Sequence, residues 1–178
     1  MTTHVIVVGS SGGGKSFLIP HSLAALGDLI QVAPRATTRE PRPDELGTNA
    51  LDIFLDLNAF ARHATGGDFL FHWPKTFPNN DPILYGIFPP PPAPVLVYPA
   101  NNYLLLCPPD TLPDVIRSNM VIVEIAADSQ TRALRILGRD PQPSAQEVAY
   151  RLLDTAASTA AFRMRPDVVI HNGRPHEE

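Results

Sequence analysis

The sequence predicts an α/β fold in which helices cover both faces of a parallel β-sheet. Short runs of branched apolar residues alternate along the chain with segments of helix-like composition, an alternation typical of parallel sheets. The runs are mostly apolar and show no regular alternation of apolar and polar residues, as expected for strands covered on both sides. A glycine-rich loop joins the first run to the first helical segment, at the edge of the sheet where such folds bind ligands.

The expected elements follow one another in a simple order. The strands are residues 5–8, 29–32, 95–98, 121–125 and 168–171. The helices are residues 15–26, 56–64, 128–137 and 144–164. Pro20 lies beyond the first turn of the first helix, where it removes a backbone hydrogen bond and is expected to kink or shorten that helix. Gly27 is the expected end of the same helix.

The loop after the first expected strand matches the pattern G-x-x-x-x-G-K-[ST] at every fixed position. Its residues are Gly9, Ser10, Ser11, Gly12, Gly13, Gly14, Lys15 and Ser16. In such a loop the backbone N–H groups form a concave anion site at a helix N-terminus. Lys15 would bind the β- and γ-phosphates of ATP, and the Ser16 hydroxyl would bind Mg²⁺. The alternative is a glycine- and serine-rich turn with a chance lysine, but the preceding strand and the full spacing favour a triphosphate site.

Composition narrows the class of protein. The chain has 178 residues, 44% of them hydrophobic, and a net charge of −4, which favours one packed domain and argues against a nucleic-acid surface. Cys107 is the single cysteine, so no intramolecular disulfide can form, and no signal peptide or membrane-spanning run is visible. We therefore expect a cytoplasmic protein whose partner is a small molecule rather than nucleic acid or a membrane.

A second basic segment follows the second expected strand. Arg39 and Arg42 are three residues apart and are held by prolines that restrict the backbone, so they could form a fork for a second phosphate. The alternative is a solvated basic turn. Further along, residues 138–144 separate two expected helices and contain two prolines and two charged residues. That pattern suits either a mobile lid or an ordinary connector.

Six motifs occur in one order along the chain. They are residues 9–16, the Thr-Thr-Arg-x-x-Arg-Pro segment at 37–43, residues 69–73, Tyr85-Gly86, Gly138-Arg139 and residues 147–151. Together they resemble the guanylate kinase superfamily across almost the whole chain. The resemblance implies a single P-loop kinase domain, residues 1–178, with a five-stranded parallel core. It also implies an inserted acceptor-binding region at about residues 34–92 and a short lid at about residues 137–146.

Carried over position by position, the resemblance assigns two groups of site residues. Arg39, Arg42 and Tyr85 would bind the phosphate of the acceptor. Arg139 from the lid and Arg151 from the following helix would act with Lys15 in catalysis, by stabilising charge on the transferring phosphoryl group. The alternative for Arg139 and Arg151 is surface ion pairing.

The chain departs from guanylate kinases at the positions that read guanine. These fall at about Arg35, His72, Ile87 and Ala100, where that family has a serine, a glutamate, a serine or threonine, and an aspartate. A guanine site depends on a carboxylate that accepts hydrogen bonds from the base. The chain therefore keeps the residues expected to bind the acceptor phosphate but lacks those that would recognise guanine. His72 is expected either to face the acceptor or to be a core histidine.

This combination resembles a sister family, the ribose 1,5-bisphosphate phosphokinases, which form phosphoribosyl pyrophosphate. Ile87 and the His171-Asn172-Gly173 turn match that family, whereas Arg42 is more like guanylate kinases. We therefore expect an ATP-dependent kinase for a phosphate-bearing acceptor, preferably ribose 1,5-bisphosphate or a related sugar phosphate. The alternatives are a nucleoside monophosphate kinase with an altered base site and a non-catalytic guanylate-kinase-like binding module.

The expected magnesium site lacks an obvious carboxylate. Residues 99–101 read Pro-Ala-Asn, where guanylate kinases carry aspartates, and Glu124 in the next expected strand could serve only as a substitute. Mg²⁺ would then be held by Ser16, the triphosphate and water molecules. The six histidines show no spacing that indicates a separate metal site.

Overall fold

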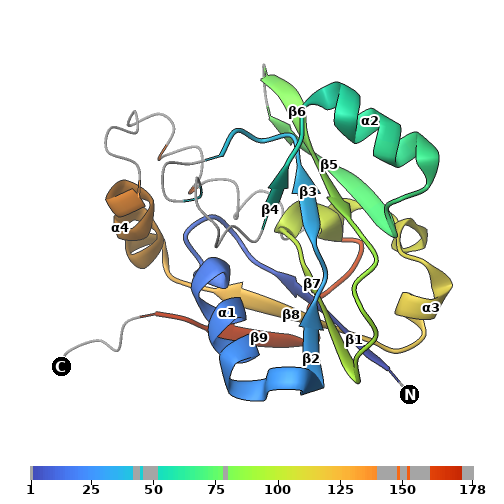
Figure 1. Cartoon of the computed structure of the whole chain (residues 1–178). Helices are drawn as coiled ribbons and strands as arrows, with labels where there is room; N and C mark the ends of the chain where they lie inside the picture. The colour runs from blue at the N-terminus through green and yellow to red at the C-terminus, as the bar shows by residue number, and fades with distance from the viewer. Residues whose placement is uncertain are drawn as a thin grey trace.

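The computed structural model describes residues 2–41, 45, 52–77, 80–139, 148, 152 and 161–173, which contain two β-sheets (Figure 1). The larger sheet has five strands in the order β2-β7-β1-β8-β9, and every neighbouring pair is parallel. Its strands are β1 (Thr3–Val8), β2 (Ile30–Val32), β7 (Val95–Pro99), β8 (Met120–Ala126) and β9 (Val168–His171). The predicted α/β fold with a five-stranded parallel sheet is confirmed, and each strand starts and stops within two residues of its expected range.

A smaller sheet is built from the chain between β2 and β7. Its strands are β3 (Arg35–Thr37), β4 (Asp52–Phe54), β5 (Phe71–Phe77) and β6 (Asn80–Ile87), in the order β4-β3-β6-β5. β3 pairs with β4 in parallel, whereas β3 with β6 and β5 with β6 are antiparallel pairs. This sheet occupies the stretch expected to bind the acceptor, and none of its four strands was among the predicted elements.

Three of the four expected helices occur in the predicted order, and the short helix before β8 was not predicted. In the described residues they are α1 (Lys15–Leu26), α2 (Leu57–Gly66), α3 (Asp114–Arg117) and α4 (Ser129–Arg139), with 3₁₀ turns η1 (Gly27–Leu29), η3 (Asn102–Leu106) and η4 (Pro109–Thr111). Pro20 does not shorten α1, because one missing hydrogen bond does not end a helix that buried Ile19 holds on the sheet. Gly27, at φ 52°, ends α1 as predicted. No helix in the described part of the chain has both the length and the hydropathy needed to cross a membrane.

The two faces of the main sheet bury different sets of side chains, since alternate residues of a strand point to opposite faces. One face packs against α1, where Ile19 meets Val7, Val97 and Ile125. The other face packs against η3, α3 and the aromatic residues of the smaller sheet. The principal members of this second cluster are Ile6, Val8, Phe71, Trp73, Tyr85, Tyr98, Leu104, Ile116 and Ile122.

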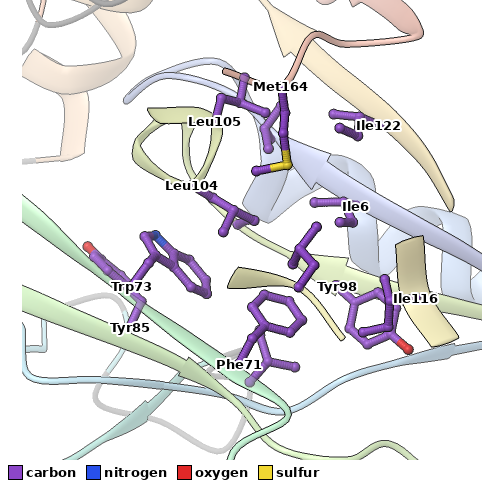
Figure 2. Packing of buried hydrophobic residues seen from close by; sticks show 14 of the residues in the cluster. Ile6, Phe71, Trp73, Tyr85, Tyr98, Leu104, Leu105, Ile116, Ile122 and Met164 are labelled. Atoms are coloured by element: carbon purple, nitrogen blue, oxygen red, sulfur yellow. The ribbon is translucent and has the colours of Figure 1, made fainter. Parts of the chain in front are cut away.

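The second cluster joins the two sheets into one core, as Figure 2 shows for the aromatic side chains. The Trp73 ring stacks on Tyr85 with 5.5 Å between the ring centres, and Phe71 lies 6.0 Å from Tyr98 of β7. The indole Nε1 of Trp73 donates to Asn101 Oδ1 at 3.1 Å, which satisfies the one polar atom of a side chain that is 1% exposed. The position of the smaller sheet is therefore fixed by burial of aromatic rings against β7 and η3.

The last expected helix, residues 144–164, lies mostly outside the described residues. Val148 and Leu152 are described and are α-helical, as predicted, whereas residues 161–164 are described and are not α-helical, so the prediction is wrong for residues 161–164. The backbone N–H groups of Arg163 and Met164 donate to the Leu105 carbonyl at 2.8 and 3.2 Å. This bend carries the Met164 side chain into the core, so apolar burial here comes from a loop rather than from a helix face.

A buried polar pair on the main sheet makes the stability of the protein depend on pH. His4 Nδ1 and the Tyr98 hydroxyl are 2.8 Å apart. Burial lowers the pKa of His4 and raises the pKa of Tyr98 to about 12. The folded state disfavours the charged imidazole, so His4 is buried at no electrostatic cost only while it is neutral. The stability that the neutral His4 contributes is complete above the unfolded pKa of about 6.5 and is lost as the pH falls below it.

We expect His4→Asn, whose side chain cannot be protonated in this range, to flatten that dependence. Urea denaturation should show the wild-type free energy of unfolding falling more steeply than that of the variant between about pH 7 and about pH 5.5. Comparing the two slopes cancels the other histidines, which are common to both proteins. Equal slopes would contradict the assignment to His4.

Candidate functional site

The glycine-rich loop leaves the carboxyl end of β1 and leads directly into the N-terminus of α1. Gly12 and Gly14 have φ values of 78° and 102°, in the left-handed region that side chains other than glycine rarely adopt. A Cβ at Gly12 would lie 2.8 Å from the Arg132 backbone oxygen, and one at Gly14 would overlap the side-chain amide of Asn172. The loop therefore requires glycine at both positions, for its backbone conformation and for its close packing.

Side chains from α4 and from the turn after β9 bind the peptide carbonyls of the loop. The bonds are Arg132 Nε to Ser11 O at 2.9 Å, Arg135 Nη1 to Gly12 O at 3.1 Å and Asn172 Nδ2 to Gly13 O at 3.0 Å. In a trans peptide the N–H points away from the C=O, so the N–H groups of residues 12–14 face away from these side chains. The Gly13 N–H already donates to the Ser10 carbonyl at 3.1 Å, so the N–H groups of Gly12 and Gly14 are the candidates for binding a ligand. Such a set of N–H groups at a helix N-terminus is suited to phosphate oxygens.

Lys15 is the first residue of α1, and its ammonium lies back across the loop. Nζ donates to the carbonyl oxygens of Gly9 and Ser10, the second at 3.4 Å. Ser16 is exposed at the next position. The first turn of α1 has no acidic residue, so the partial positive charge of the helix N-terminus is not reduced from within the helix.

The three side chains that hold the loop were not predicted from the sequence. Arg132 and Arg135 are three residues apart on a predicted helix, a spacing that places them on one face. That spacing was the available signal, but it does not say which part of the chain the face meets. Asn172 was noted for its turn and was given no role.

Two asparagines follow β7, and their side chains have different surroundings. Asn101 Oδ1 accepts from Trp73 Nε1 and so belongs to the core. Asn102 is 6% exposed, and its Nδ2 donates to Ser10 Oγ at 3.2 Å and to Glu124 Oε1 at 3.4 Å. Its Oδ1 is buried and has no hydrogen-bond partner among the described residues. Asn102 and Glu124 therefore lie against the start of the glycine-rich loop with one acceptor atom unsatisfied.

These groups fit two different parts of a magnesium nucleotide. The loop N–H groups and Lys15 suit phosphate oxygens, whereas Asn102 Oδ1 and the Glu124 carboxylate suit hydrogen-bond donors such as metal-bound water. Within the described ranges, no group of three or more histidine, cysteine, aspartate and glutamate side chains could hold a metal ion. Acceptor atoms of this kind suit the water ligands of Mg²⁺, which often keeps several waters when it binds to proteins.

Two arginines of the smaller sheet form a chain of ion pairs with two carboxylates. Arg35 binds Asp52 through two hydrogen bonds of 2.7 and 2.9 Å. Arg39 binds Glu45 at 2.8 Å and Asp52 at 3.2 Å. Burial alone would lower the pKa of Arg39, but Glu45 and Asp52 offset this and raise it, so the guanidinium stays charged. The guanidinium predicted to bind an acceptor phosphate is thus paired with carboxylates in this structure.

Tyr85, the other predicted acceptor residue, lies in the same sheet. Tyr85 is opposite Thr37 in the β3–β6 pair, and Thr37 is two residues before Arg39 in the chain. Its side chain is 7% exposed, stacks on Trp73 and lies with the Arg35 guanidinium carbon 5.5 Å from its ring centre. The structure therefore brings Arg39 and Tyr85 to one part of the smaller sheet, with Tyr85 packed firmly into the core.

The positions that correspond to guanine-reading residues hold two buried apolar side chains, an arginine in an ion pair and an exposed histidine. Ile87 and Ala100 are fully buried, and Arg35 is committed to Asp52. His72 is exposed on β5, with its ring centre 6.3 Å from that of Phe60, so the expectation of a core histidine is wrong. An exposed His72 remains compatible with the other expectation, a residue that faces the acceptor.

Several predicted residues lie where the structure gives no side-chain description. Arg42 and Arg151 are outside the described residues, as are residues 140–146 of the expected lid. Arg139 is the last residue of α4, and its backbone alone is described. The catalytic roles of Arg139 and Arg151 and the role of Arg42 remain predictions.

No protein-family model matches the chain, and no curated protein is similar to it in sequence. Among solved structures, the chain is similar to the guanylate kinase from Anaplasma phagocytophilum, with a TM-score of 0.56 and 18% sequence identity. The likeness covers 96% of this chain and 78% of that one. At this identity it establishes the fold and leaves the substrate open. The chain therefore has a fold like that of this guanylate kinase.

The close packing of the loop predicts a difference between two glycines with similar backbone conformations. Gly12 and Gly67 have φ values of 78° and 73°, but a Cβ at Gly67 would meet nothing within 4 Å. Gly67→Ala should cost about 1–2 kcal/mol for the left-handed conformation alone. Gly12→Ala should cost about 1–3 kcal/mol more, because the Arg132 backbone must move. Urea denaturation measures both, and equal losses would show that the loop is not closely packed on α4.

Proposed function

We propose that this protein is an ATP-dependent phosphotransferase whose acceptor carries a phosphate, by preference ribose 1,5-bisphosphate or a related sugar phosphate. The proposal rests on the glycine-rich loop. Its carbonyl oxygens accept hydrogen bonds from α4 and Asn172, and Lys15 at the start of α1 lies across it. The fold adds that this loop belongs to a kinase-type framework. With ribose 1,5-bisphosphate the product would be phosphoribosyl pyrophosphate.

The chemistry asked of the protein is mainly positioning and charge stabilisation. The N–H groups of the loop and Lys15 would bind the β- and γ-phosphates, and Ser16 would bind Mg²⁺. Mg²⁺, when bound, supplies further neutralisation of phosphate charge. The bond between the β- and γ-phosphates breaks, ADP leaves, and an acceptor phosphate oxygen forms the new P–O bond. No general base is needed, because that oxygen is already deprotonated.

The placement of the two halves supports this scheme. Strands β1 and β2 are both parallel to β7, so they end at the same edge of the sheet. The glycine-rich loop follows β1, and the smaller sheet begins at Arg35, three residues after β2. The donor site and the arginines of the acceptor region therefore leave the main sheet from one edge, where parallel sheets bind ligands.

The acceptor preference follows from what the smaller sheet lacks. Guanine would require acceptors for its N–H and amino groups, but the matching positions are buried Ile87 and Ala100, the paired Arg35 and His72. An acceptor that is recognised through its phosphate does not require those base-binding groups, and Arg39 and Tyr85 would bind the phosphate. Arg39 would exchange Glu45 or Asp52 for a phosphate that offers it two oxygens in a similar geometry.

Two other functions have an observation in their favour. The likeness to a guanylate kinase favours a nucleoside monophosphate acceptor with an altered base site. The absence of a carboxylate at Pro99, Ala100 and Asn101, at the end of β7 and just after it, favours a non-catalytic binding module.

A coupled ADP-release assay distinguishes the three. The full chain would be tested with Mg-ATP and ribose 1,5-bisphosphate, GMP, dGMP, AMP, CMP, UMP or no acceptor, and products identified by mass. Stimulation by ribose 1,5-bisphosphate supports the preferred function, and stimulation by a nucleotide supports the second. ATP binding without ADP release with any acceptor supports a binding module.

Replacing Arg39 should separate acceptor binding from donor binding. Arg39→Ala should raise the KM for ribose 1,5-bisphosphate by about tenfold or more, the loss expected for charge-assisted hydrogen bonds, while the KM for ATP changes little. Arg39→Lys keeps the charge but loses the two-pronged hydrogen-bonding geometry of the guanidinium. Its KM for ribose 1,5-bisphosphate should therefore lie between those of the wild type and Arg39→Ala. Arg62→Ala, on the exposed surface of α2, is the control. An equal rise in both KM values would remove Arg39 from the acceptor site.

A further inference from the structure

We propose that Asn102 and Glu124 together hold the water ligands of the nucleotide-bound magnesium ion, in place of the carboxylate missing after β7. The inference rests on the proposed function in one respect, that the glycine-rich loop binds Mg-ATP. It concerns this chain's own acceptor atoms and does not depend on which acceptor is phosphorylated.

The two residues come from either side of β1, Glu124 from the neighbouring strand β8 and Asn102 from the turn that follows the other neighbour, β7. Glu124 of β8 is in register with Val8, the last residue of β1. Asn102 is the first residue of η3, which follows β7. Asn102 Nδ2 reaches Ser10 Oγ and Glu124 Oε1, so the pair spans the first residues of the glycine-rich loop. An ion bound beside the phosphates lies at this same end of β1.

The orientation of the Asn102 amide is fixed by its partners. Its NH₂ group donates to the carboxylate, and a reversed amide would place an oxygen against a carboxylate oxygen. The amide oxygen is therefore the atom left without a partner, and it is buried. A buried acceptor without a donor costs about 1–3 kcal/mol, so the structure favours a ligand that supplies a hydrogen there.

The chemistry of that ligand is restricted by the two groups. Asn102 Oδ1 and the Glu124 carboxylate are both acceptors, and phosphate oxygens have no hydrogen to give them. Among the described residues, no arginine or lysine forms an ion pair with Glu124. A carboxylate near a triphosphate repels it unless a cation lies between them. Water molecules on Mg²⁺ satisfy both conditions, because they donate hydrogen bonds and bring positive charge.

A purely structural role for Asn102, fastening Ser10 through Nδ2, makes a different prediction. In that case its loss would weaken ATP binding equally with and without metal. If Asn102 and Glu124 hold metal-bound water, Glu124→Gln should leave metal-free ATP binding unchanged or improve it, because a repulsive charge is removed. The same variant should lose most of the gain that Mg²⁺ gives.

The test is calorimetric titration of the full chain with ATP, once in excess EDTA and once in saturating Mg²⁺. The ratio of the two Kd values measures the metal-dependent gain. For Glu124→Gln this ratio should fall by about tenfold or more, the usual effect of removing a group that supports a metal ligand. Asn102→Asp, which keeps an acceptor and adds charge, should raise the ratio. Asp110→Asn, an exposed carboxylate in η4, should leave it unchanged.

A second measurement reads the metal directly and needs no turnover. The electron paramagnetic resonance of Mn²⁺ in its complex with ATP and protein should show weaker Mn²⁺ binding in Glu124→Gln than in wild type. If the wild-type chain binds no ATP under either condition, the proposed function fails and this inference with it. If wild type shows a metal-dependent gain that Glu124→Gln and Asn102→Asp leave unaltered, this inference is overturned while the proposed function stands. Should Glu124→Gln not fold, Asn102→Asp decides alone.

Discussion

The hydrogen bonds that hold the carbonyl oxygens of the glycine-rich loop are the interactions on which the site depends. A run of glycines has a high conformational entropy, so an unsupported loop would sample many shapes. Arg132 and Arg135 bind it with charged donors, each worth about 1.5–3 kcal/mol in such a bond. Arg135 also donates to the Asn172 carbonyl at 2.9 Å, which ties α4 to the end of β9. One set of bonds thus fixes the loop and the elements around it.

The parallel sheet explains why residues far apart in sequence meet at this loop. All five strands run in one direction, so the segments that follow them leave from a single edge. The glycine-rich loop follows β1, Asn102 follows β7, Asn172 follows β9, and α4 follows β8. The segments after β7, β8 and β9 each supply a side chain that donates a hydrogen bond to the loop. Asn102 donates to the Ser10 hydroxyl, Arg132 of α4 to the Ser11 carbonyl and Asn172 to the Gly13 carbonyl. An antiparallel arrangement would have sent half of these segments to the opposite edge.

The main sheet could be predicted because strands buried on both faces leave a direct mark on the sequence. Residues 95–98 are apolar in succession and residues 121–125 are apolar apart from Glu124, a pattern typical of strands buried on both faces. The smaller sheet leaves no such mark. β3 and β4 have three residues each, and Pro74 and Pro82 lie within β5 and β6, where they act against a strand prediction.

The loop could likewise be predicted, whereas its supports could not. The glycines and Lys15 are close together in the sequence, and the backbone conformation they allow depends on these residues alone. The bond from Arg132 to Ser11 joins residues 121 positions apart, and its existence depends on how α4 packs after the sheet has formed. The same holds for Asn102 and Glu124, whose contact follows from the register of β8 on β1. Residues that act through tertiary contacts of this kind have no local signature to read.

The charges of the acceptor region bear on how the proposed kinase would select its substrate. Arg35 and Arg39 are balanced by Asp52 and Glu45, so the region presents no excess of positive charge. A phosphate would therefore bind by replacing a carboxylate at Arg39 rather than by neutralising a free cation. Its gain over Glu45 comes from a second negative charge and a better match to the guanidinium fork. A sugar without phosphate offers neither and leaves Glu45 in place, so the internal ion pair itself would exclude unphosphorylated acceptors.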